Sequence, residues 1–179
     1  MKYIDAASAV DYYIAMEMMK PIDGNMHASV KMYKTRDTAT GPGKLFFGPL
    51  WDFDIAMGNE NNPGNQGSPE GWYLRDPNLV EKTQVDVSWF NRLNDDPQFQ
   101  QMVKDRWVEV YPNLGSIHTF IGQQRSLISA SAARNFTIWS VSERLYPEQI
   151  IRGSWSAEVN SLDSWLTQRI AWMDRQYRS

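Results

Sequence analysis

Apolar residues recur at helical spacing over much of the chain. Residues 5–20 are good helix formers, with Asp5 as a candidate N-cap, and Pro21 is expected to end this helix. The clearest amphipathic pattern lies near the end of the chain and predicts a terminal helix. Its apolar positions are Val159, Leu162, Leu166, Ile170, Met173 and Tyr177.

Two further helices are predicted between these. Asp96 followed by Pro97 is typical of a helix start, and Pro112 is expected to end that helix. Its apolar stripe consists of Phe99, Val103, Trp107 and Val110. Ser116 is expected to begin the next helix, whose apolar positions are Ile117, Phe120, Ile121, Leu127 and Ile128.

A different pattern occupies the stretch after Pro21. Residues 30–34 alternate as in a strand, residues 44–50 are largely apolar, and a Gly-Pro-Gly turn at 41–43 separates them, so a β-hairpin is expected. Residues 58–71 hold only polar, Gly and Pro positions and predict a long loop, either a functional flap or a poorly ordered segment. Because the sequence shows no repeat and no linker, we expect one α+β domain over residues 1–179.

Composition excludes several classes of protein. The formal net charge is −3 and the basic residues are scattered, which argues against nucleic-acid binding. The absence of cysteine excludes disulfides, thiolate zinc sites and a cysteine nucleophile. No apolar stretch approaches the roughly 20 residues that span a bilayer. The first residues do not form an export signal, so the signal of an exported protein is expected upstream.

The sharpest chemical feature is the run of residues 48–54, GPLWDFD. In an extended segment, Asp52 and Asp54 project to the same face with Cα atoms about 6 to 7 Å apart, a spacing that suits a divalent cation such as Mg²⁺. The alternative is that these aspartates cap a turn or pair with Arg or Lys.

Asp23 follows the first helix directly, on a turn before the hairpin. A carboxylate there can accept a proton from a substrate hydroxyl, or it can bond its own backbone in an Asx-turn. His27 and His118 lack partner residues typical of a site and are interpreted as structural.

The aromatic residues suggest a second kind of site. Trp107 and Trp165 lie on or beside helical stripes and are expected in the core. Trp51, Trp72 and Tyr73 lie in or beside the loop region, where exposed rings could stack on sugars.

Taken together, these segments resemble the family of spore coat protein H (CotH) kinase-like proteins. The resemblance rests on the helix from Tyr3 to Glu17, the Asp23 turn, the strand ending in Tyr33 and Lys34, and the run KLFFGPLWDFDIAMGN at residues 44–59. The closing stretch at residues 161–174 also resembles that family's final helix.

The resemblance implies the mainly helical C-terminal lobe of an atypical protein-kinase-like fold, with the nucleotide-binding lobe expected before Tyr3. It implies transfer of phosphate from ATP to Ser or Thr of a protein substrate, at a spore coat or an extracellular cell surface. By that pattern Asp23 is the catalytic aspartate, Asp52, Asp54 and Ser29 hold Mg²⁺, and Trp51 and Asp52 lie at the nucleotide. The isolated chain is expected to have little activity.

Two rival functions remain. The first is a non-catalytic coat or surface scaffold, suggested by Ser29 at a place where family members often carry Asn. The second is a carbohydrate-binding module, suggested by Trp72, Tyr73 and the long loop.

Overall fold

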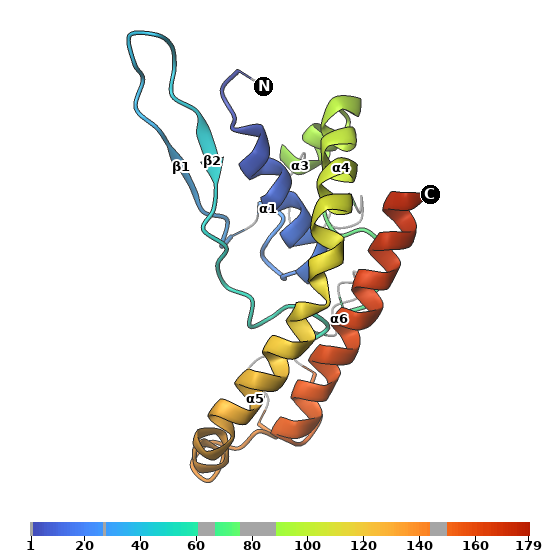
Figure 1. Cartoon of the computed structure of the whole chain (residues 1–179). Coiled ribbons are helices and arrows are strands. Elements are labelled where there is room, and N and C mark those ends of the chain that lie inside the picture. Colours follow the sequence, from blue (N-terminus) through green and yellow to red (C-terminus); the bar gives the residue numbers. More distant parts are fainter. Residues whose placement is uncertain (1, 27, 61–66, 76–88, 144–149) are drawn as a thin grey trace.

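The computed structural model describes residues 2–26, 28–60, 67–75, 89–143 and 150–179. Within these ranges a small antiparallel hairpin accompanies a mainly helical chain, as the α+β prediction has it (Figure 1). The helices are α1 (Ala6–Met19), α3 (Trp89–Asn94), α4 (Pro97–Leu114), α5 (Ser116–Asn135) and α6 (Trp155–Arg178), and the strands are β1 (Met32–Lys34) and β2 (Leu45–Phe47).

Helix α1 begins and ends as the sequence predicts. The Asp5 side chain accepts a hydrogen bond from Ser8 N at 2.9 Å, which caps the first turn. Lys20 has a left-handed backbone and its N–H bonds Met16 O, so the helix stops before Pro21. Buried residues occur around most of this helix, which therefore lies at the centre of the core.

The core forms where α4 and α6 pack against α1. Tyr13 of α1 meets Phe99 of α4 edge to face at 5.5 Å, and Trp107 of α4 meets Tyr177 of α6 at 5.3 Å. These rings are buried, which confirms the stripes predicted for α4 and α6. Figure 1 shows α1 between the hairpin on one side and α4 and α6 on the other.

The hairpin is shorter than the predicted strands but has the predicted pairing. Met32 pairs with Phe47 and Lys34 with Leu45. Leu45 also bonds the segment before α1, because its N–H donates to Tyr3 O at 2.8 Å. The hairpin is thereby fixed beside the start of α1.

Pro112 does not end the fourth helix, so that prediction was wrong. Helix α4 continues to Leu114, and Gly115 keeps a right-handed helical backbone before α5 begins at Ser116. Proline lacks the donor that would bond the carbonyl four residues earlier, but the backbone nevertheless keeps its helical course past this position. In Figure 1, α5 therefore continues from the end of α4 and runs beside α6.

Candidate functional site

Two segments that carry the predicted site residues run side by side in opposite directions. One is the turn after α1, at residues 19–29, and the other is the segment after β2, at residues 52–57. The hydrogen bonds that join them run from Met57 N to Met19 O (2.8 Å), from Ile22 N to Ile55 O (3.0 Å) and from Ser29 Oγ to Asp52 Oδ2 (2.7 Å). Asp23 thus lies on the segment next to the one that carries Asp52 and Asp54.

Ser29 and Asp52 both adopt left-handed backbones, with φ of 54° and 70°. L-residues rarely occupy this region, and they remain there only when their surroundings hold them. Here the hydrogen bond between the two side chains and the paired segments hold them. Backbone strain of this kind is concentrated in functional sites.

The acidic side chains of the candidate site form no ion pairs with other described residues. In the described ranges, none of the carboxylates of Asp23, Asp52 and Asp54 pairs with Arg or Lys. The Asp23 backbone carbonyl accepts from Ala28 N at 3.2 Å, while no described group donates to its carboxylate. Neither the ion-pair nor the Asx-turn interpretation is therefore supported.

The donor atoms at Asp52 fit a hard cation. A carboxylate and a hydroxyl oxygen lie 2.7 Å apart on an exposed edge. Among the described residues, no group of three or more His, Cys, Asp or Glu side chains is arranged to hold a metal ion. Mg²⁺ is often bound through one or two carboxylates and completes its shell with water and phosphate oxygens, so Asp52 with Ser29 suits that mode.

Trp51 presents its ring to solvent directly before Asp52, with 58% of its surface exposed. The expectation that Trp72 and Tyr73 are exposed is wrong. Tyr73 is fully buried, and Trp72 packs edge to face on Trp172 at 4.9 Å. Both rings serve the core, which removes the main support for a carbohydrate-binding surface.

Sequence reasoning missed a buried ion pair beneath the site. Glu17 of α1 and Arg169 of α6 are both fully buried and lie 3.1 Å apart. Burial lowers the pKa of the Arg169 guanidinium, and Glu17 opposes this effect. The signal was present, because each residue is a single charge among apolar neighbours on its helix.

This pair holds residues 67–75, which we call the strap, under the site. Glu17 accepts from the backbone N–H groups of Tyr73 and Leu74, each at 2.8 Å. Arg169 donates to the carbonyl oxygens of Pro69 (3.0 Å) and Gly71 (2.7 Å). The strap is thus anchored to α1 and α6 through its backbone.

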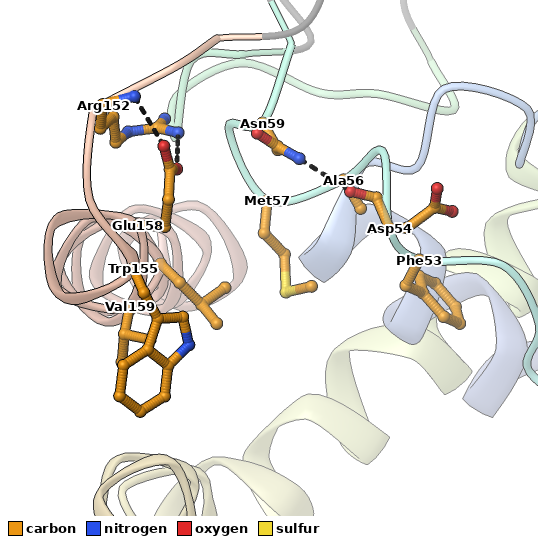
Figure 2. Close-up of a pocket in the computed structure, with 10 residues that line it drawn as sticks. Phe53, Asp54, Ala56, Met57, Asn59, Arg152, Trp155, Glu158 and Val159 are labelled. Atoms are coloured by element: carbon orange, nitrogen blue, oxygen red, sulfur yellow. Dashed lines mark hydrogen bonds and ion pairs between the residues drawn. The ribbon is translucent and has the colours of Figure 1, made fainter. Parts of the chain in front are cut away.

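A cavity of about 240 Å³ opens beside Asp54, between residues 53–59 and the start of α6 (Figure 2). Its wall is largely apolar, with Met57 and Trp155 on opposite sides. Arg152 closes one edge, because it bonds Glu158 at 2.7 Å and Gly58 O at 2.8 Å. The polar groups of this edge therefore already bond one another.

The two histidines have different outcomes. His118 Nδ1 lies 2.6 Å from Asp163 Oδ1, a partner that the sequence did not indicate, and this contact joins α5 to α6. His27 lies outside the described residues.

Comparison with known proteins identifies the class to which this arrangement belongs. The family model for the CotH kinase protein matches residues 1–173. The chain is therefore a member of the CotH kinase protein family. Searches of curated proteins and of solved structures found no match.

Proposed function

We propose that the chain takes part in an ATP- and Mg²⁺-dependent transfer of phosphate to Ser or Thr of a protein. It would contribute the residues that bind Mg²⁺ and the residue that orients the acceptor hydroxyl. The main support is the contact between Ser29 and Asp52, which pairs two oxygen donors next to the Asp23 turn. Family membership supports the same reaction class.

Each residue has a role that its position permits. Asp52 and Ser29 would hold Mg²⁺, which neutralises charge on the transferred phosphate, with Asp54 beside them. Asp23, whose carboxylate has no described partner, would accept the proton of the acceptor hydroxyl and orient it. Trp51 would lie beside the nucleotide. This arrangement would correspond to the larger lobe of a kinase-like domain.

Magnesium-dependent nucleotide binding tests the proposal. Calorimetry on the natural full-length protein with a non-hydrolysable ATP analogue should show binding that EDTA removes. Asp52→Ala should weaken it at least roughly 10-fold, since even the outer partners of metal ligands contribute that much. Asp23→Asn should leave this affinity unchanged and abolish phosphorylation of a protein acceptor.

Asp95→Ala is the matched control. It removes the same charge from an exposed position beside α3, where Asp95 pairs with Arg92. If Asp52→Ala and Asp95→Ala bind the nucleotide equally well, the assignment of Asp52 is wrong.

A non-catalytic coat or surface scaffold is the second candidate, and Ser29 favours it. A neutral hydroxyl is a weaker magnesium ligand than the amide carbonyl that family members often carry there. Absence of magnesium-dependent nucleotide binding in wild type would support the scaffold. The family's link to spore coats fits a coat or surface location for either function. In the described part of the chain, no helix is both long and apolar enough to span a membrane.

A further inference from the structure

We propose that Tyr73, on the strap, is a positioning residue that fixes the Asp23 turn through a hydrogen bond to its backbone. This inference rests on the proposed function, in which Asp23 orients the acceptor hydroxyl. It assigns a role in that reaction to a residue that contacts neither the metal site nor the acceptor.

The contact runs from the phenol to the turn. Tyr73 Oη donates a hydrogen bond to the carbonyl oxygen of Pro21, two residues before Asp23. The same carbonyl accepts from Gly24 N at 3.1 Å, the residue directly after Asp23. Tyr73 therefore bonds the oxygen on which the turn closes.

Gly24 lies in a tightly packed part of the turn that also contacts the phenol. A Cβ atom at Gly24 would lie 3.3 Å from Tyr73 Oη and 2.5 Å from Pro21 Cγ. The second distance is far below van der Waals contact, so the turn cannot accept a side chain here without moving. The turn is therefore packed directly against Met16 and the Tyr73 phenol, and it cannot shift toward them without a clash.

The phenol itself is fixed in place. Tyr73 is fully buried, and Glu17, held by Arg169, accepts from its backbone N–H. Burial raises the pKa of the Tyr73 phenol far above its ordinary value. The hydroxyl therefore keeps its proton and remains a donor at neutral pH.

Tyr73→Phe removes only this hydroxyl and tests the proposal. By NMR hydrogen exchange, the amides of Gly24 and Ala28 should exchange about fivefold faster, as expected when about 1 kcal/mol of hydrogen bonding is lost. In the phosphorylation assay, kcat should fall on the order of 10- to 100-fold because the acceptor is misplaced. The affinity for the magnesium–nucleotide analogue should not change.

Tyr177→Phe is the matched control. Tyr177 is also buried, with 6% of its surface exposed, but its hydroxyl has no hydrogen-bond partner in the described structure. This variant should change neither the exchange of the turn nor kcat.

The outcomes separate this inference from the proposed function. Unchanged exchange at Gly24 and Ala28 in Tyr73→Phe overturns the positioning role, whether or not the wild type is active. Faster exchange with unchanged kcat in an active protein also overturns it. A wild type that shows no phosphate transfer refutes the proposed function instead, while the exchange data still decide whether Tyr73 holds the turn.

Discussion

Asp52 keeps its carboxylate at the site in a backbone conformation that glycine would adopt more readily. Its φ is 70°, and the neighbouring Ser29 has a φ of 54°. A left-handed conformation costs an L-residue roughly 1 to 2 kcal/mol, and somewhat less for Asp. The carboxylate is therefore placed at some expense of stability, which is expected where a side chain serves a reaction.

Two substitutions at this position separate the backbone from the carboxylate. Asp52→Gly and Asp52→Ala both remove the hydrogen bond from Ser29, but only glycine relieves the backbone. Asp52→Gly should therefore be more stable than Asp52→Ala by about 1 kcal/mol, measured by urea denaturation. Equal stabilities would show that the backbone at this position carries no strain.

At this scale the sequence indicated which segments meet, but it did not indicate their backbone geometry. The DFD motif and the Asp23 turn indicated acidic residues near a cation, and the structure places their segments side by side. The left-handed backbones of Ser29 and Asp52 depend on contacts between segments far apart in the chain, which local patterns do not contain. Tyr73 was misinterpreted as exposed because its burial depends on α1 and α6.

Between the elements, the ion pair of Glu17 and Arg169 connects α1, α6 and the strap. Arg169 donates to Glu17 O at 2.7 Å as well as to the strap carbonyls. Replacing one member of a buried pair leaves the other charge without compensation, and this costs more than the intact pair contributes. The pair therefore ties α1, α6 and the strap to one another.

Arg169→Ala should lower the free energy of unfolding by about 3 to 5 kcal/mol, because the Glu17 carboxylate would remain buried without its counter-charge. Urea denaturation measures the loss. Arg92→Ala, which breaks an exposed pair with Asp95, should change stability by no more than about 0.5 kcal/mol. Similar effects of the two substitutions would mean that the buried pair does not support the fold.

The sequence predicted correctly where the long helices lie. It predicted only some of their ends. The caps at Asp5 and Asp96 are the ones that the sequence indicates, and each side chain accepts a hydrogen bond from the first turn. The end of α4 was misplaced because the helical backbone continues past Pro112 to Leu114. Helix α6 begins at Trp155, before the first residue of its predicted stripe, where Ser154 caps it.

Across the whole molecule, α5 differs from the other long helices in how little it buries. Ala132 is its buried residue, whereas α1 and α6 bury aromatic and aliphatic side chains along their length. Leu127 has 76% of its surface exposed and Phe120 has 57%. The apolar pattern of residues 117–128 predicted the helix correctly but overstated its packing.

Hydrogen exchange should therefore divide the molecule into regions of unequal stability. Opening of α5 exposes little apolar surface, so its amides should exchange through local opening, at free energies well below that of global unfolding and with little dependence on low urea concentrations. Amides in the middle of α1 serve as the internal control, because their release requires separation from α4 and α6 and should follow global unfolding. If α5 shows the same protection and the same urea dependence as α1, then α5 unfolds together with the core.

The candidate site should not be affected by local opening of α5. Its segments are joined to the end of α1 by described hydrogen bonds, so the contact between Ser29 and Asp52 should stay intact.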